Sequence, residues 1–211
     1  MKGPSSVELH GLGIVNGENA SAYEFPWQVA LYQNDQLACG ASIIASRWIL
    51  TAGHCVSDMD DINNLPVYPP DVLTTLSGAL DLSNLTEPTR VLSKVAANFR
   101  HPNYTDTDHA YSDIALLKLT EDLPLSNPNV SHLGAICLPK ANLPIDSLAG
   151  AVCTATGHGQ LDPDSDVSDI LQRVNMTIEK QEECVAAYVP DHHKVDNSMI
   201  CAIGEDQEHH K

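Results

Sequence analysis

The sequence has few positively charged residues. It holds 11 lysines and arginines against 28 aspartates and glutamates in 211 residues, which gives a formal net charge of −17 at pH 7. A surface with this excess of negative charge repels the phosphate backbone of nucleic acids and the anionic head groups of lipids. We therefore expect no nucleic-acid partner and no membrane partner.

Long apolar runs are also absent. No stretch of about 18 apolar residues occurs, so no membrane-spanning helix is predicted. The segment from Met1 to Glu8 lacks the apolar centre of a secretory leader. Hydrophobic residues nevertheless make up 43% of the chain, which is enough to build a packed core. A folded protein is therefore expected.

Helical periodicity is scarce, and short apolar or alternating runs separated by turn residues are typical of an all-β protein. Eight runs predict strands, namely 28–32, 41–45, 48–51, 72–76, 90–96, 115–119, 151–156 and 171–178. A helix is predicted over 179–188, where charges come early and apolar residues later. Residues 123–148 are rich in Pro, Asn and Ser, which indicates a connector between two barrels with a cleft between them.

Two side chains suited to proton transfer lie next to predicted strands. His54 follows the apolar run 48–50 in Thr-Ala-Gly-His-Cys, and Asp113 opens the run Asp-Ile-Ala-Leu-Leu-Lys-Leu. Histidine can take a proton from a weak nucleophile near neutral pH, and an aspartate behind it fixes the ring tautomer. A histidine and an aspartate taken alone are more often incidental, so the surrounding residues decide their meaning.

Seven further sequence motifs occur around and after these two residues. They are Ile14 to Gly17 with Phe25 to Leu31, Cys39 to Ile44, Trp48 to Cys55, His101 to Tyr104 ahead of Asp113, Ile136 to Pro139, Cys153 to Gly159, and Met199 to Ala202. Together they resemble the motifs of the trypsin/chymotrypsin-like serine proteases over about 14–204. The resemblance implies an all-β fold of two antiparallel barrels with the active site between them. It also implies that His54 is the general base and that Asp113 orients it.

The resemblance divides the chain as well. It makes residues 1–13 the remnant of a pro-segment, Ile14 the mature N-terminus and residues 14–211 the protease domain. Within that domain the first barrel is expected over about 28–122, the connector over 123–148 and an incomplete second barrel over 149–211. Gly13 stands where the family has Arg or Lys before its activation cleavage.

Six cysteines allow fifteen pairings, and the sequence alone does not choose among them. The resemblance pairs Cys39 with Cys55, which would brace the loop of His54, and Cys184 with Cys201. It leaves Cys137 and Cys153 unpaired. A bond between these two, or to another chain, stays open.

The family's nucleophilic serine lies in a Gly-Asp-Ser-Gly-Gly turn, and the 211 residues contain no Gly-x-Ser-x-Gly segment. Ser42 and Ser198 are present, but by the resemblance neither faces His54. We therefore expect a serine endopeptidase that is truncated before its nucleophile and inactive as this chain, because acyl transfer needs the nucleophile and its oxyanion donors. The alternative is a non-catalytic protease homologue that acts as a secreted binding or regulatory module.

Five Asn-x-Ser/Thr sequons are candidates for N-glycosylation, at Asn19, Asn84, Asn103, Asn129 and Asn175. Together with the cysteines they favour a secreted, extracellular protein. The partners implied by the resemblance are protein or peptide substrates and protease inhibitors.

No cofactor and no metal is expected. The loop 78–87 occupies the place of a loop that binds calcium in some family members. Ala79 and Thr86 stand here where those proteins have carboxylates, so no calcium is expected. The histidine pairs at 192–193 and 209–210 are predicted to be solvated surface residues.

Overall fold

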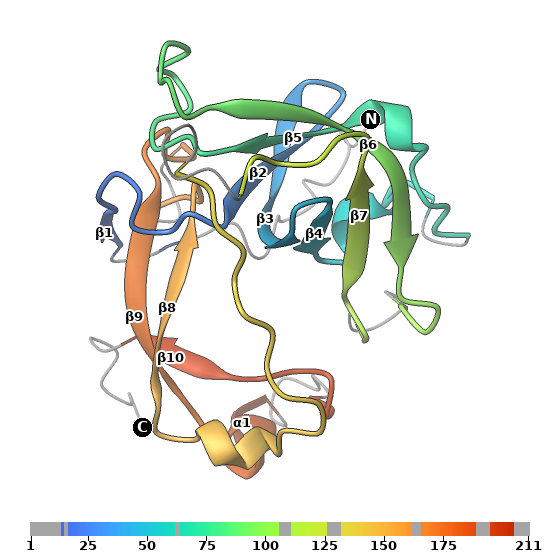
Figure 1. Ribbon diagram of the computed structural model, residues 1–211. Coiled ribbons are helices and arrows are strands. Elements are labelled where there is room, and N and C mark those ends of the chain that lie inside the picture. The colour runs from blue at the N-terminus through green and yellow to red at the C-terminus, as the bar shows by residue number, and fades with distance from the viewer. Residues whose placement is uncertain are drawn as a thin grey trace, which may run out of the picture.

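The computed structural model describes residues 14, 17–61, 64–105, 111–125, 132–161, 166–188 and 195–204. It has two β-rich parts (Figure 1). The first is a closed barrel of six antiparallel strands in the order β2-β3-β4-β7-β6-β5. Its strands are β2 (Gln28–Gln33), β3 (Gln36–Ala45), β4 (Trp48–Thr51), β5 (Leu73–Ser77), β6 (Val91–Arg100) and β7 (Ala115–Leu119).

The barrel closes around the apolar side chains that alternate along its strands. In β7, Ala115, Leu117 and Leu119 are buried, whereas the two residues between them are partly exposed. Leu117, Ile43 and Ile49 have no exposed surface at all. Removing such side chains from water is the main source of stability. Closure also leaves no strand edge unpaired.

The second part is an open sheet built around one long strand. Strand β9 (Gln172–Ile178) pairs with β8 (Val152–Gly157) on one side, and with β1 (Glu18–Asn19) and β10 (Ala202–Gly204) on the other. The predicted fold class is thereby confirmed: the protein is mostly β, with one closed barrel and a second, partial sheet.

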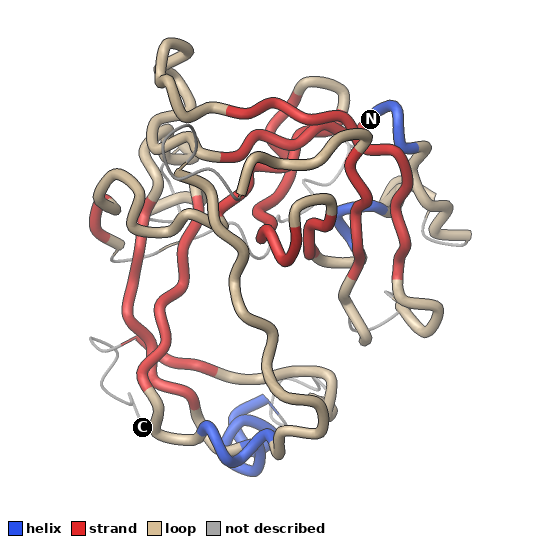
Figure 2. The backbone as a smooth tube through the Cα atoms, in the orientation of Figure 1, coloured by secondary structure: helices blue, strands red, loops and turns tan. Residues whose placement is uncertain are grey.

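All eight predicted strands are present. Those at 48–51 and 115–119 match their predicted bounds, and the others shift by one to five residues at one or both ends. Strand β3 begins earlier than predicted, because Asn34 and Asp35 adopt positive φ angles of 47° and 63° and make a tight hairpin turn from β2. The helix α1 (Gln181–Tyr188) begins two residues after its predicted start. Most of the remaining chain is loop (Figure 2).

The short elements were not predicted. They are β1, β10 and three 3₁₀ turns, η1 (His54–Val56), η2 (Pro70–Val72) and η3 (Ile145–Leu148). Strand β1 matters most for the domain boundaries, because it lies ahead of the first barrel in sequence and yet belongs to the second sheet. Glu18 pairs there with Arg173, and Asn19 with Gln172.

The connector follows the wall of the first barrel. In its described part, the Gly134 N–H donates to the Pro26 carbonyl at 3.0 Å, and the Ile136 N–H to the Ile43 carbonyl at 2.9 Å. Leu133, the residue before Gly134, is buried in the barrel core. A hydrogen bond from the Thr156 hydroxyl to Gln28 Oε1, 2.7 Å long, joins the two parts directly.

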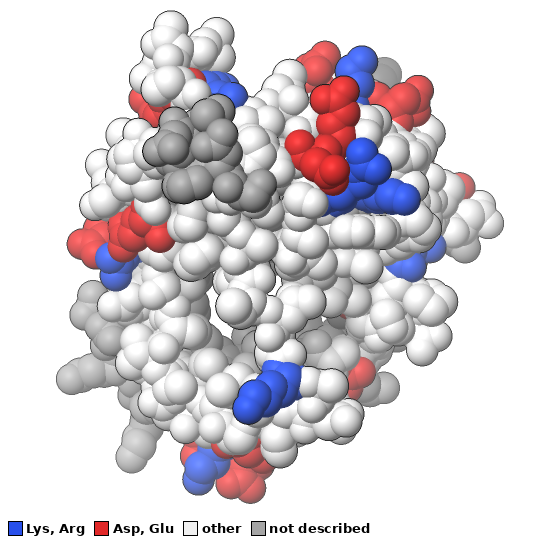
Figure 3. Space-filling model, viewed as in Figure 1, with Lys and Arg blue, Asp and Glu red and all other residues white. Residues whose placement is uncertain are grey.

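Charged side chains on the face shown in Figure 3 lie in a few small groups, most of which contain both signs, with wide uncharged areas between them. Arg47 and Asp122 form one pair of opposite charges, with Nε and Oδ1 3.2 Å apart. No helix in the described ranges is both long and apolar enough to cross a membrane.

The described core predicts that truncation of Leu117 lowers the stability of the fold much more than truncation of Leu92. Leu117→Ala, at a fully buried site, should lower the free energy of unfolding by about 2–5 kcal/mol. Leu92→Ala is the matched control, because Leu92 is 71% exposed, and it should change the value by at most about 0.5 kcal/mol. Urea unfolding followed by tryptophan fluorescence measures both. Equal effects would contradict the described core.

Candidate active site

His54 is the first residue of the 3₁₀ turn η1, which begins three residues after the end of β4. The next residue, Cys55, is buried and bonded to Cys39 of β3. The Ser57 hydroxyl donates to the Gly53 carbonyl at 2.8 Å and closes the turn. The disulfide ties this turn to the barrel, and 48% of the His54 side chain is exposed.

Asp113 reaches His54 through the pairing of β4 with β7. In this antiparallel ladder Thr51 lies opposite Ala115. Antiparallel strands run in opposite directions, so continuing the same register by two residues places position 53 opposite position 113. Oδ2 of Asp113 lies 2.8 Å from Nδ1 of His54. Oδ1 accepts the backbone N–H of His54, also at 2.8 Å. One carboxylate therefore binds both the ring and the main chain of the same histidine.

Gly53 makes this close approach possible. A Cβ atom at position 53 would lie 3.1 Å from Oδ1 of Asp113 and 3.0 Å from the Tyr104 ring. Tyr104 is 6% exposed, and the guanidinium of Arg100 lies 5.3 Å from its ring centre. A larger residue at position 53 would push the carboxylate or the ring away. This role of Gly53 was not predicted from the sequence, although a glycine immediately before the histidine was a visible signal.

The environment of Asp113 favours its charged form. Burial alone would raise the pKa of this carboxyl. The hydrogen bonds from the ring and backbone of His54, the charge of that ring when protonated and the Gly53 N–H together hold the pKa below its ordinary value of 3.8. An ionised carboxylate only accepts hydrogen bonds, so Nδ1 of His54 carries the proton between them. The basic lone pair is then on Nε2.

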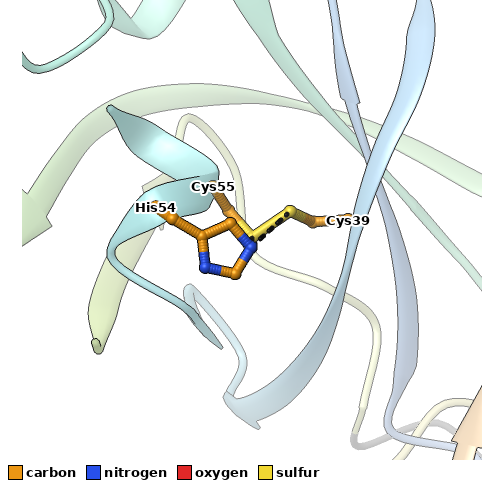
Figure 4. A group of neighbouring side chains, drawn as sticks. All are labelled: Cys39, His54 and Cys55. Carbon is orange, nitrogen blue, oxygen red and sulfur yellow. Dashed lines mark hydrogen bonds between the residues drawn. A yellow bond between two sulfur atoms is a disulfide. The ribbon is translucent and has the colours of Figure 1, made fainter. Parts of the chain in front are cut away.

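Nε2 of His54 faces the neighbouring disulfide (Figure 4). It lies 3.3 Å from Sγ of Cys55 and 3.7 Å from Sγ of Cys39. His54, Cys39 and Cys55 lie close enough together to share a metal ion, and within the described ranges they are the one cluster of potential metal ligands. Cysteine binds metals as a thiolate, and sulfurs joined in a disulfide carry no thiolate charge. While the disulfide is intact, these three residues therefore do not suit a metal ion.

A second histidine, His158, is buried in the fold and contacts the backbone. It is 8% exposed and its Nδ1 lies 3.2 Å from the Ser168 carbonyl. Burial lowers the pKa of His158, although the Ser168 and Asp169 backbones and nearby carboxylates oppose this. A neutral imidazole packed among backbone groups accounts for this residue without a catalytic role.

Ile14, the expected mature N-terminus, packs against the second sheet. Its N–H donates to the Gln160 carbonyl at 2.8 Å. Its side chain covers Gly17 and Gly157, where a Cβ atom would lie 2.6 Å and 3.8 Å from Ile14 carbons. It also lines a cavity of about 150 Å³ between the two parts. The expected pro-segment, residues 1–13, lies outside the described residues.

The structure contains the two disulfides that the resemblance implies. Cys39 is bonded to Cys55, and Cys184 of α1 to Cys201, with Cα atoms 6.1 Å and 5.9 Å apart. Cys137 and Cys153 both carry free thiols, the first exposed and the second partly buried.

The sequons differ in their surroundings. Asn19, Asn84 and Asn103 are exposed. Asn175 is partly buried within β9, where its side-chain oxygen accepts the Thr154 hydroxyl at 3.1 Å. Asn129 lies outside the described residues, as do the histidine pairs at 192–193 and 209–210.

Of the two serines considered from sequence, Ser42 lies in β3 and pairs with Gln28 of β2. Ser198 lies next to the site rather than in it. Its hydroxyl oxygen accepts the N–H of Ser112, the residue before Asp113, at 3.2 Å. No sequence signal predicted this contact.

Comparison with known proteins agrees with the geometry. The sequence model of the family described as trypsin matches residues 14–210. Similar curated proteins include mouse (Mus musculus) ovochymase-2, 32% identical over 82% of this chain and 26% of that protein. Rat (Rattus norvegicus) transmembrane protease serine 9 is 32% identical over 90% of this chain and 16% of its own length. Serine protease SP24D of Anopheles gambiae is 33% identical over 83% of this chain and 57% of its own length.

The chain thus spans between 16% and 57% of the length of these relatives. The family match, by contrast, covers nearly all of the chain and includes both His54 and Asp113. The closed barrel, the partial second sheet and the paired histidine and aspartate are all in agreement with it. The chain therefore belongs to the trypsin family of serine proteases.

Proposed function

We propose that this chain carries the base of a serine endopeptidase, with His54 as the general base and Asp113 as its orienting partner. The observation that supports this most strongly is the double contact of Asp113 with the ring and the backbone of His54, at 2.8 Å each. Members of the trypsin family act on protein substrates, so the reaction proposed is hydrolysis of peptide bonds.

The proton transfer follows from the geometry. With Nδ1–H bound to the carboxylate, the lone pair of Nε2 takes the proton of a serine hydroxyl as its oxygen attacks the substrate carbonyl. The imidazolium that forms is stabilised by Asp113, whose low pKa keeps it ionised. The same imidazolium then protonates the leaving amine. The 48% exposure of the His54 side chain supports access of reactants to the imidazole.

The nucleophile is the part of the proposal that the 211 residues do not supply. They contain no Gly-x-Ser-x-Gly segment, in which the nucleophile and the oxyanion donors would lie together. Without both, the base alone gives little acceleration of acyl transfer. We therefore expect these residues on their own not to cleave peptides.

Extracellular location, N-glycans and protease inhibitors as binding partners belong to the same proposal. Two disulfides and three exposed sequons, at Asn19, Asn84 and Asn103, support the first two. Inhibitors are included because they bind family members at the same site as substrates.

The nucleophile can be tested by labelling with a fluorophosphonate, which bonds only to an activated serine. The 211-residue chain should remain unlabelled. The product of the transcript read beyond the Lys211 codon should be labelled if it supplies an in-frame Gly-Asp-Ser-Gly-Gly. Labelling of the 211-residue chain would contradict its expected inactivity. A stop codon directly after Lys211 would contradict the endopeptidase proposal and would favour a non-catalytic binding or regulatory module.

The roles of the two residues predict large losses of activity in the extended, serine-bearing protein. His54→Ala and Asp113→Asn should each lower kcat by about 10³–10⁴-fold, with a much smaller change in KM. His132→Ala is the control, since His132 stacks on Tyr23 at 3.9 Å and should leave kcat unchanged. Near wild-type activity of His54→Ala would rule out its role as base.

The low pKa of Asp113 predicts how stability depends on pH. A carboxyl whose folded-state pKa is depressed stabilises the fold above its unfolded pKa, and this contribution is lost as the pH falls through the lower folded value. The wild-type chain should therefore be more stable than Asp113→Asn at neutral pH, and the difference should shrink below pH 3.8. Chemical denaturation at a series of pH values measures it. A constant difference down to the acid limit would contradict the assignment.

A further inference from the structure

The residue before Asp113 has an unusual backbone conformation. Ser112 has a φ angle of 52°, in the left-handed region that residues with a Cβ atom rarely adopt. Such a conformation persists only where neighbouring contacts hold it in place. Because Ser112 sets the direction in which Asp113 leaves the loop, whatever holds Ser112 also sets the position of the carboxylate.

Hydrogen bonds hold Ser112 on both sides of its Cα atom. Its carbonyl accepts the Ile114 N–H at 2.8 Å, which makes a tight turn centred on Asp113. Its own N–H donates to Oγ of Ser198 at 3.2 Å, although Ser198 comes 86 residues later. Ser198 lies on the segment that leads into β10, and Figure 1 shows this segment reaching from the second sheet towards the loop ahead of β7.

The orientation of Ser198 suits it to accept this bond. Its hydroxyl donates to Oδ1 of Asp196 at 2.6 Å, and its backbone N–H donates to the same oxygen at 2.7 Å. Because the single hydroxyl proton goes to Asp196, only the lone pairs of Oγ face the Ser112 N–H. Donation to a carboxylate also polarises the hydroxyl and makes its oxygen a better acceptor.

The segment that carries Ser198 is anchored to the second part of the molecule. The Asp196 carbonyl accepts Nε2 of Gln181, the first residue of α1, at 2.8 Å. The N–H of Gln181 donates to Oδ1 of Asp146 at 3.0 Å. Cys201, three residues after Ser198, is bonded to Cys184 of the same helix. The contact with Ser112 therefore connects two structured regions.

We propose that Ser198 is a positioning residue for the His54–Asp113 pair, acting across the two parts of the protein through the backbone of Ser112. It accepts the Ser112 N–H, holds this residue in its left-handed conformation and so directs both oxygens of Asp113 at His54. The significance for catalysis rests on the proposed function, whereas the structural connection does not.

The chain contains a matched control for this arrangement. Ser83 donates its hydroxyl to Oδ1 of Asp81 at 2.6 Å and its backbone N–H to the same oxygen at 2.9 Å. This reproduces the local geometry of Ser198 with Asp196. The motif lies on the loop between β5 and β6, and the hydrogen bonds of Ser83 are made within that loop. Ser83→Ala thus removes the same local motif and leaves Ser112 untouched.

The test is NMR on the full 211-residue chain, with two readouts. One is hydrogen exchange of the Ser112 amide, and the other is the downfield proton resonance of the His54 Nδ1–H bond to Asp113. In Ser198→Ala, Ser112 should exchange about three- to tenfold faster, and the His54 resonance should broaden or shift upfield. Ser198→Thr keeps the hydroxyl, and Ser198 is exposed, so the added methyl has room and both readouts should be restored. Ser83→Ala should match the wild type.

Unchanged Ser112 exchange and an unchanged His54 resonance in Ser198→Ala would overturn the proposal, as would equal changes in Ser83→Ala. The wild-type chain provides a check that needs no variant, because a Ser112 amide that exchanges at the rate of an unprotected peptide also overturns it. Failure of the proposed function looks different. In that case the extended protein cleaves no peptide, while the Ser112 and His54 results hold.

Discussion

The hydrogen bonds between Asp113 and His54 are the interaction on which the candidate active site depends. They exist because the β4–β7 ladder brings positions 53 and 113 face to face at one end of a closed barrel. The glycine at position 53 leaves room for the carboxylate, and the Cys39–Cys55 disulfide ties the turn of the histidine to β3. The pair is thus a consequence of the β4–β7 pairing, whose backbone register brings the two residues together. This precision matters because proton transfer is sensitive to small displacements.

The two parts of the molecule contribute differently. The first barrel buries its own core and holds both His54 and Asp113. The second sheet is open within the described residues, and its strands include β1, which comes from ahead of the barrel in sequence. The contact between Ser198 and Ser112 adds a connection at the loop that carries Asp113. The proposed positioning of Asp113 by Ser198 would thus act from one part of the molecule on the other.

The long strands and the two candidate catalytic residues could be predicted from the sequence. The short strands and the tertiary contacts around the site could not, for identifiable physical reasons. Alternating apolar residues predicted the long strands, because a two-residue period survives wherever one face is buried, as in β7. Strands β1 and β10 have two and three residues, which is too short for any periodicity. His54 and Asp113 were found because they lie in distinctive motifs. The packing of Tyr104 on Gly53 and the left-handed Ser112 with its distant partner depend on tertiary contacts that no local pattern encodes.

Asp113 holds His54 in one tautomer, with the proton on Nδ1 and the basic lone pair on Nε2. Nitrogen-15 NMR of the histidine rings measures this directly, because protonated and unprotonated ring nitrogens have well-separated chemical shifts. In the 211-residue chain at a pH where His54 is neutral, we predict a protonated Nδ1 and an unprotonated Nε2, and loss of this preference in Asp113→Asn. A wild-type His54 with the proton on Nε2, or with the two tautomers averaged as in free imidazole, would rule out this role of Asp113.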